Sequence, residues 1–420
     1  MSAKKKKKQF LIYMHKPQRT PSLSSRKSCG SLLFLEMEWG IMPFRHYSFK
    51  ANKGVEFMNL DRRNFIKSAG LAAGAAMAGC TTAPKASSPI PPEGDIRSVL
   101  LHLGHNMWCD WYPEDFDVSK VKHGLPDKKL RCDDGIWRAS VDYMAAKGMN
   151  QLVIDVGEGL VYPSHPELAI EGSWSPDKLS NEISRARSLG LEVIPKLNFS
   201  TTHNGWLKYY RRMVSTPHYY RLCEDLLADV SKIFGRPRYI HIGCDEEDTT
   251  WHMMHSKTRL YIVARRTEMW KHDFLHLVNN IESLGSRAWA WSDYGWDHPD
   301  FTEWCPKSVL LSNWYYDEGN GGFDPANNKI EEDKKRLSQY AQLEAAGYDQ
   351  VPCGTNWVGW MRKRMNAGAD DVIGSLVKYC RKTISSKHLK GFMMAPWKPS
   401  SNADDLAFIK RGIDLFAAAL

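Results

Sequence analysis

Residues 151–199 read QLVIDVGEGLVYPSHPELAIEGSWSPDKLSNEISRARSLGLEVIPKLNF. Two apolar runs, 151–157 and 191–199, flank a segment that opens with Ser175-Pro176-Asp177 and closes at Leu189-Gly190. Serine accepts the free N–H groups at the start of a helix, and glycine adopts the left-handed conformation after its end. The stretch therefore predicts a strand–helix–strand unit.

The same alternation continues on both sides of this unit. Continuous apolar runs separated by helical segments are typical of parallel strands that are buried on both faces. Eight such runs in the region 96–420 predict a (β/α)8 TIM barrel as a single domain. A doubly wound open sheet is the alternative, but it would need a glycine-rich phosphate loop after a strand, and the sequence has none. The eight runs are 98–104, 151–157, 191–199, 238–243, 287–293, 309–316, 349–357 and 389–397.

The net charge of +9 resides in the first part of the chain. Residues 1–57 contain 12 Lys+Arg and 3 Asp+Glu, so 45 basic and 45 acidic residues remain after them. A basic leader on a neutral body indicates targeting or an unstructured tail, and we expect no nucleic-acid partner.

Residues 58–80 read MNLDRRNFIKSAGLAAGAAMAGC. The apolar run after Arg62 and Arg63 is too short to span a bilayer as a mature helix. The segment resembles a twin-arginine export signal that ends in a lipoprotein box, which implies that Cys80 becomes a lipidated N-terminus. We therefore expect an exported lipoprotein, periplasmic or at the cell surface, that is held to the membrane by its lipid.

The position of this signal predicts the nature of the segments on either side of it. A signal of this kind begins at its own Met58, so we expect residues 1–57 to be a non-native or disordered upstream extension. Residues 81–95 are rich in Pro, Ser and Ala, which predicts a flexible linker between the lipid and the domain. The seven cysteines after Cys80 form no CxxC pair and no zinc-type spacing, and we expect them to be buried as small apolar side chains.

A TIM barrel carries its chemistry on the loops that leave the carboxyl ends of its strands. In this sequence those ends are polar and aromatic, and tryptophan follows five of the eight runs. Flat apolar faces beside amide and carboxylate groups suit a pyranose ring, so we expect a glycan or amino-sugar substrate. The candidate substrate-binding residues are His105, Asn106, Glu158, His203, Trp289, Trp291, Asp293, Asn313, Trp314, Tyr315, Trp357 and Trp397.

Two adjacent acids, Asp245 and Glu246, end the fourth run in YIHIGCDE (239–246). HIGCDE resembles the HIGGDE motif of the family 20 glycoside hydrolases, the β-N-acetylhexosaminidases. The resemblance extends over about residues 98–400. The stretches similar to that family's second and third strand regions are KGMN (147–150) with YP (162–163), and ARSLGLEVIP (186–195) with His203.

The resemblance implies substrate-assisted hydrolysis of a glycosidic bond, without a cofactor or a metal. Glu246 would protonate the leaving oxygen, with a pKa raised by burial near Asp245. Asp245 would orient and polarise the substrate's 2-acetamido group, whose carbonyl oxygen attacks the anomeric carbon. The implied aromatic surroundings are Trp289, Trp291 and Trp314 around the acetamide, Tyr315 or Tyr316 as a donor to its oxygen, and Trp397 beneath the ring.

The seventh run gives separate support, because it ends in GTNW (354–357) without a carboxylate. Retaining glycosidases on this barrel commonly take an acid from strand four and a nucleophile from strand seven. A pair of acids on strand four with no acid opposite favours a nucleophile supplied by the substrate.

Several positions depart from the family's pattern. Cys244 replaces the second glycine of the motif, and Val153 and Asp155 replace the His-x-His of the second strand. Lys196 and Asn198 replace acids of the third strand, and Trp397-Lys398 stands where the last strand usually has Trp-x-Glu. The acid pair is kept while the residues that grip the sugar hydroxyls differ. A barrel that binds glycans without cleaving them is therefore a second hypothesis.

A metal-dependent hydrolase is a third hypothesis. Asp245–Asp248 followed by His252 and His255 contains carboxylate and imidazole ligands, but it lacks the HExxH pattern. A solvated acidic turn followed by helix residues explains the same letters.

Overall fold

The computed structural model describes residues 90, 95–111, 117, 119, 124–248, 252–253, 262–316, 322–357 and 372–420. All of them belong to one compact unit, Thr82–Leu420. The predicted extension (1–57), the export signal with Cys80 (58–80) and nearly all of the linker (81–95) lie outside the described residues. No helix in the described ranges has the length and apolarity that crossing a membrane requires.

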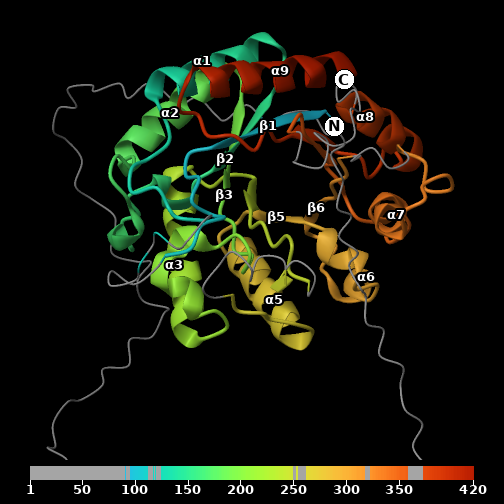
Figure 1. Cartoon of the computed structure of the whole chain (residues 1–420), viewed down its shortest axis with the longest axis horizontal. Coiled ribbons are helices and arrows are strands. Elements are labelled where there is room, and N and C mark those ends of the chain that lie inside the picture. Colours follow the sequence, from blue (N-terminus) through green and yellow to red (C-terminus); the bar gives the residue numbers. More distant parts are fainter. Residues whose placement is uncertain are drawn as a thin grey trace, which may run out of the picture. The chain divides into compact units, whose positions relative to one another are not determined.

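Eight parallel strands form the centre of this unit, in the order β6-β5-β4-β3-β2-β1-β8-β7. Isolated parallel bridges Leu311–Gln350 and Trp314–Cys353 join the two edges, so the sheet closes on itself (Figure 1). The predicted TIM barrel is confirmed, and each predicted run overlaps a strand. The strands are β1 (Ile96–His102), β2 (Gln151–Asp155), β3 (Glu192–Lys196), β4 (Tyr239–His241), β5 (Arg287–Trp291), β6 (Leu310–Ser312), β7 (Cys353–Gly354) and β8 (Gly391–Met394).

Helices surround the strands, and the last helix packs beside the first (Figure 1). Ser175 and Thr216 cap two of them as the sequence predicts, since their hydroxyls accept the N–H groups of Lys178 and Tyr219 at 3.2 and 3.3 Å. The α-helices are α1 (Asp134–Ala146), α2 (Pro176–Ser188), α3 (Pro217–Ile233), α5 (Glu268–Ser283), α6 (Phe301–Trp304), α7 (Glu331–Ala345), α8 (Val372–Thr383) and α9 (Ala403–Ala419), and the 3-10 helices are η2 (Gly157–Gly159), η3 (Pro166–Leu168), η4 (Gly205–Arg212) and η5 (Asp293–Trp296).

Alternation of side chains along each strand divides the core into two layers. One layer fills the space between strands and helices, and the other fills the barrel, with Leu100, Val153, Ile194 and Trp289 among its members. Six of the seven described cysteines are buried as expected, whereas Cys132 is half-buried, and all seven are free thiols.

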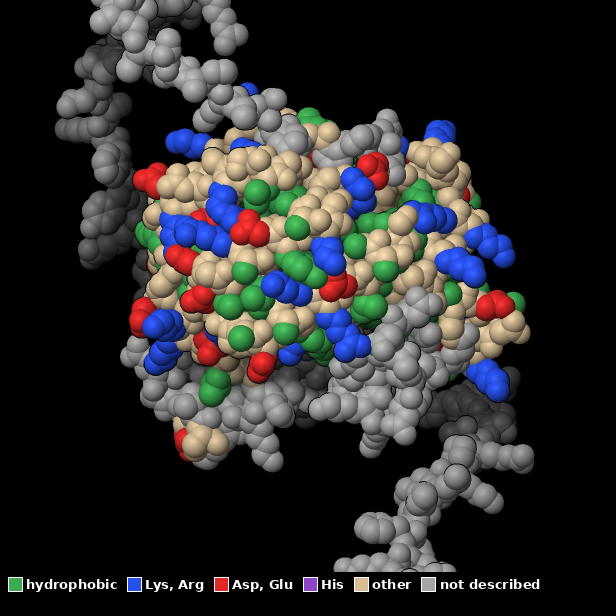
Figure 2. Space-filling view, turned by 90° about the horizontal axis from the view of Figure 1, so that it is seen from above, with side chains coloured by type: hydrophobic (Ala, Val, Ile, Leu, Met, Phe, Trp, Pro, Cys, Tyr) green, Lys and Arg blue, Asp and Glu red, His purple; other side chains and the backbone are tan. Residues whose placement is uncertain are grey.

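The outer surface carries both signs of charge. On the face seen from above the view of Figure 1, where α1 and α9 lie, basic and acidic side chains are interspersed (Figure 2). This distribution agrees with the equal numbers of basic and acidic residues after residue 57.

Candidate active site

The chain turns sharply after β4, and the turn presents the acid pair. Gly243, Cys244 and Glu246 have φ values of 68°, 67° and 56°, in the left-handed region that side chains with a Cβ rarely adopt. A Cβ on Gly243 would lie 2.0 Å from Asn198 Oδ1, so the close approach of β3 and β4 requires glycine. Non-glycine residues in this conformation are strained, and such strain is concentrated at functional sites.

Asp245 is held by two side chains from the loop after β3. Asn198 Nδ2 donates to Asp245 Oδ1 at 2.9 Å, and His203 Nδ1 lies 3.6 Å from the same oxygen. Burial raises the pKa of Asp245 from 3.8 to about 6, although the charge of Lys196 and the hydrogen bond from Asn198 oppose the rise. Asp245 therefore loses its proton close to neutral pH.

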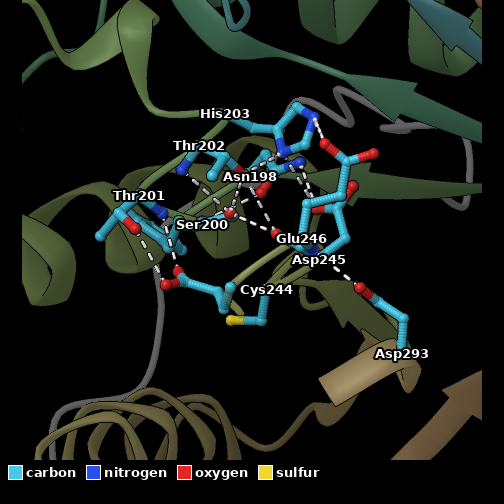
Figure 3. A network of polar contacts seen from close by, with 12 residues as sticks. Asn198, Ser200, Thr201, Thr202, His203, Cys244, Asp245, Glu246 and Asp293 are labelled. Carbon is cyan, nitrogen blue, oxygen red and sulfur yellow. Dashed lines mark hydrogen bonds and ion pairs between the residues drawn. The ribbon is translucent and has the colours of Figure 1, made fainter. Parts of the chain in front are cut away.

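Glu246 faces the same imidazole from the other side. Its Oε2 lies 3.5 Å from His203 Nε2, while its backbone N–H donates to Asp293 Oδ2 at 2.7 Å. Figure 3 shows His203 beside both carboxylates, with Asp293 below the backbone of Glu246. The two neighbouring acids thus converge on one point at the mouth of the barrel.

Glu247, the third acid of the turn, points away from this group. Its Oε1 accepts the backbone N–H of Thr201 and Arg265 Nη2, each at 2.7 Å, and its Oε2 accepts the Thr201 hydroxyl at 2.9 Å. Burial alone would raise the pKa of Glu247, but the Arg265 guanidinium holds it at about 2. The Thr201–Glu247–Arg265 cluster therefore ties the loops after β3 and β4 to the start of α5.

A chain of aromatic rings continues from the acid pair along the mouth. The Trp108 ring lies 6.0 Å from His203 and 6.3 Å from Trp397, and Trp397 lies 6.0 Å from Trp291. Trp397 Nε1 donates to the hydroxyl of Tyr316 at 3.2 Å. Four of the predicted site residues are thereby joined to the acids: His203, Trp291, Trp314 (stacked on Tyr316, 5.1 Å) and Trp397.

Trp289, Asn313 and Tyr315 are not brought to the acid pair. Trp289 lies one layer deeper than Trp291, completely buried in the barrel, and donates to the Ser312 hydroxyl at 2.8 Å. Tyr315 packs into the outer layer of the core, whereas Trp314, its neighbour in the segment after β6, packs against the layer inside the barrel. Asn313 accepts from Trp296 at 2.9 Å and donates to a backbone carbonyl of α7 at 2.8 Å, which fixes its loop.

The predicted residues in the loops after β1 and β2 are hydrogen-bonded to one another. Glu158 Oε1 accepts the backbone N–H groups of His105 and Asn106 at 2.8 and 2.9 Å. Arg131 Nη2 lies 2.8 Å from His105 Nδ1, and burial followed by the charge of Arg131 lowers the pKa of His105 to about 3. His105 contacts Trp108 at 5.0 Å, so this group supports one side of the aromatic chain.

Trp357, the remaining predicted residue, follows β7 and is 39% exposed. Its backbone N–H donates to the Thr355 hydroxyl at 2.9 Å. The roles of Trp357, His105, Asn106 and Glu158 toward a substrate stay predictions.

Beneath the mouth lies a buried ion pair. Lys196 Nζ donates to Asp155 Oδ2, and His102 Nδ1 lies 3.5 Å from that oxygen. Burial lowers the pKa of His102 and of His241, so both imidazoles are neutral. Across the ranges that the structure describes, no group of three or more His, Cys, Asp or Glu residues is arranged to hold a metal ion.

The sequence prediction does not include Trp108 or Arg265, and it includes Tyr316 only as an alternative to Tyr315 as the donor to the acetamido oxygen. Trp108 lies in the loop after the first run, in the same set of strand ends as the other tryptophans, and that position is a sufficient signal. Arg265 has no such signal, because it precedes α5 and is 18 residues from Glu247. Of the pair named for the metal alternative, His252 contacts the Thr201 hydroxyl at 2.9 Å, and His255 lies outside the described residues.

Solved structures with a similar barrel are β-N-acetylhexosaminidases. The Bacteroides fragilis enzyme is 13% identical with a TM-score of 0.50, over 76% of this chain and 65% of that chain. A glycoside hydrolase family 20 β-N-acetylglucosaminidase is 11% identical with a TM-score of 0.48, over 77% and 70%. A mutant Streptomyces plicatus β-hexosaminidase with bound GlcNAc is 14% identical with a TM-score of 0.49, over 76% and 63%.

This chain thus spans less than two thirds of the Bacteroides and Streptomyces structures. At these identities the likeness shows the fold. No protein-family model matches the sequence, and neither does any curated protein.

Proposed function

We propose that this protein is a glycoside hydrolase that removes terminal β-linked N-acetylhexosamine-type sugars. The observation that carries the proposal is the convergence of Asp245 and Glu246 on His203, at 3.6 and 3.5 Å, within an aromatic mouth of the barrel. Aromatic faces bind the C–H faces of a sugar, while the acids supply the polar groups that cleavage needs.

In the proposed reaction the substrate's own acetamido oxygen is the nucleophile. Glu246 donates a proton to the glycosidic oxygen as the bond to the anomeric carbon breaks, and the acetamido oxygen forms a bond to that carbon. Asp245, as a carboxylate, accepts the acetamido N–H and stabilises the positive charge of the cyclic intermediate. Water then attacks the anomeric carbon as Glu246 removes its proton and the bond to the acetamido oxygen breaks, which returns the proton to Glu246.

The loop after β7 supports the choice of an internal nucleophile. The Thr355 hydroxyl donates to the carbonyl of Ala395 at 2.6 Å, and the Asn356 amide donates to that of Phe408 at 2.9 Å. Both side chains serve the packing of their loop, and residues 353–357 contain no carboxylate. Within residues 353–357, the described part of this loop, no acid is therefore available for a covalent intermediate.

Hydrolysis of aryl β-glycosides with and without the 2-acetamido group tests the proposal. The full chain is expected to cleave the N-acetylglucosaminide about 100-fold faster than the glucoside, and Asp245→Asn is expected to remove most of that preference. Asp297→Asn is the matched control, because Asp297 lies at the end of η5 and pairs with Lys335 at the surface. Equal cleavage of both substrates would contradict the substrate-assisted reaction.

A glycan-binding protein without turnover is the second candidate, and Lys196 favours it. A lysine bonded to Asp155 occupies the floor where the resemblance predicts an acid. In that case the chain would bind N-acetylglucosamine with the same affinity before and after Glu246→Gln, and neither form would release the aryl group.

We also propose that the protein is exported and held to a membrane through lipidated Cys80. In a bacterial host with a twin-arginine pathway, Cys80→Ser is expected to move the exported protein from the membrane fraction to the soluble fraction and to abolish fatty-acid labelling. Replacement of Arg62 and Arg63 by lysine should instead block export. Unchanged membrane association of Cys80→Ser would refute the lipid anchor.

A further inference from the structure

Asp293 has an unusual position for a residue predicted to bind substrate. It is the first residue of η5, and its side chain is buried at the foot of the acid pair. Asp293 Oδ2 accepts the backbone N–H of Glu246 at 2.7 Å (Figure 3). Its other oxygen, Oδ1, is buried without a hydrogen-bond partner in the described part of the chain.

The Glu246 backbone depends on this contact. A φ of 56° at a glutamate costs conformational energy, and the orphan N–H of such a turn must find an acceptor when it is buried. Asp293 Oδ2 is that acceptor. The direction of the Glu246 side chain toward His203 follows from the turn, so Asp293 acts on Glu246 through the backbone.

The charges around Asp293 disfavour its ionisation. Asp245 and Asp248 face it from the turn after β4. Burial, followed by the charge of Asp245, raises the pKa of Asp293 well above its usual range, although hydrogen bonds from the backbone N–H groups of Glu246 and Asp293 oppose the rise. Two neighbouring buried carboxylates do not both ionise readily. From the strands beside it, Lys196 is bonded to Asp155, and His241 is neutral.

We propose that Asp293 is a positioning residue that holds the strained turn at Glu246 as an uncharged carboxylic acid. Its carbonyl oxygen accepts the Glu246 N–H, and its hydroxyl carries the proton. In this state Asp293 adds no negative charge beside Asp245, which therefore remains a carboxylate at a lower pH than it would beside a second charge. The catalytic consequence rests on the proposed function, whereas the protonation state does not.

Two substitutions distinguish an acid from a carboxylate. Asp293→Asn keeps the size, the acceptor for Glu246 N–H and the absence of charge, so kcat is expected to stay within about threefold. Asp293→Ala removes the acceptor, and we expect kcat to fall about tenfold or more with a smaller change in KM. Asp297→Asn again serves as the control, since that carboxylate pairs with Lys335 outside the site.

The pH profile adds a measurement that a merely structural role would not move. Asp245 must be ionised to act, so kcat/KM is expected to rise with pH up to about 6. In Asp293→Asn this acid limb should not shift, because one neutral group replaces another. A shift of about one pH unit toward acid, or a loss of activity equal to that of Asp293→Ala, would mean that Asp293 is charged and would overturn the proposal.

Infrared spectroscopy tests the protonation state without relying on turnover. At neutral pH the carboxylic-acid C=O absorption of the full chain is expected to fall in Asp293→Asn and to be retained in Asp297→Asn, while absorption from a protonated Glu246 stays in both variants. Equal absorption in the parent protein and in Asp293→Asn refutes the proposal for Asp293 even if the enzyme is active. A loss of absorption in Asp293→Asn in a protein without glycosidase activity refutes only the proposed function.

Discussion

Glu246→Gln is expected to lower kcat about a thousandfold on an N-acetylglucosaminide whose leaving group is another sugar. A glutamine has nearly the same shape but no proton to give, and general acid catalysis typically contributes about 10²–10⁴-fold. A sugar alkoxide is a poor leaving group, so the full contribution of the acid is lost. Binding is expected to change little, because the partly exposed Glu246 carboxylate contributes chiefly to the transition state.

The leaving group provides the internal control for this experiment. With a dinitrophenyl glycoside the leaving phenolate is stable without protonation, so the loss on formation of the intermediate should shrink to about tenfold or less. Steady-state kcat on both substrates, with pre-steady-state release of the phenol, measures the two steps separately. Equal losses on the sugar and dinitrophenyl substrates would show that Glu246 does not act as the general acid.

The fold was predictable because its signals are local. Each apolar run predicts a buried strand. Ser175 and Thr216 predict the starts of two helices, and in the structure their hydroxyls accept N–H groups there. Strand ends were less predictable. β1 begins at Ile96, two residues before the predicted run, because Ile96 and Arg97 pair with Gly391 and Phe392 of β8, a partner almost 300 residues away.

The site was predictable only to the level of the loops. Pattern alone shows that aromatic and acidic residues follow the strands, but not which face each one occupies. Trp314, Tyr315 and Tyr316 illustrate the difficulty, since the sequence does not show that Tyr315 packs into the outer layer while Trp314 packs against the layer inside the barrel. Asp293 likewise stands among substrate-binding candidates by sequence, whereas its hydrogen bond to the Glu246 backbone depends on a turn with positive φ.

Pairings between side chains on neighbouring strands could not be predicted either, because the sequence does not show the register of the strands. Asp155 and Lys196 both appear in the sequence as departures from the resembled family, and neither explains the other there. In the barrel they occupy one register position of β2 and β3, which allows their ion pair. The acid and the cation therefore share the floor of the barrel, and the buried charge is balanced.

Glu247→Gln is expected to lower the free energy of unfolding by about 3–5 kcal/mol, since it breaks a buried ion pair on one side only. Arg265 would keep its 3.0 Å contact with Asp273 and its hydrogen bond to the carbonyl of Phe199, but lose the carboxylate at 2.7 Å. Both side chains of the pair are at most 2% exposed, so water does not replace the lost partner. Urea unfolding at neutral pH, followed by fluorescence and by circular dichroism, measures the change.

Glu331→Gln is the matched control, because Glu331 pairs with Lys334 on the surface of α7 at 2.7 Å with its side chain 81% exposed. Exposed pairs of this kind contribute about 0–1 kcal/mol. A loss in Glu247→Gln no larger than in this control would contradict the buried-pair assignment.

Acid titration of stability gives an independent value for the same pair. In the folded chain the pKa of Glu247 is about 2, against 4.5 for an unperturbed glutamate, so the folded state binds this proton more weakly than the unfolded state. The stabilisation is therefore complete above about pH 4.5 and is lost as the pH falls toward 2; its size is about 3 kcal/mol. Glu247→Gln should flatten the fall of stability over this pH window, whereas Glu331→Gln should leave it unchanged. An unaltered slope in Glu247→Gln would mean that Glu247 has the same pKa in the folded and the unfolded chain, so that its ionisation gives no net stabilisation at neutral pH.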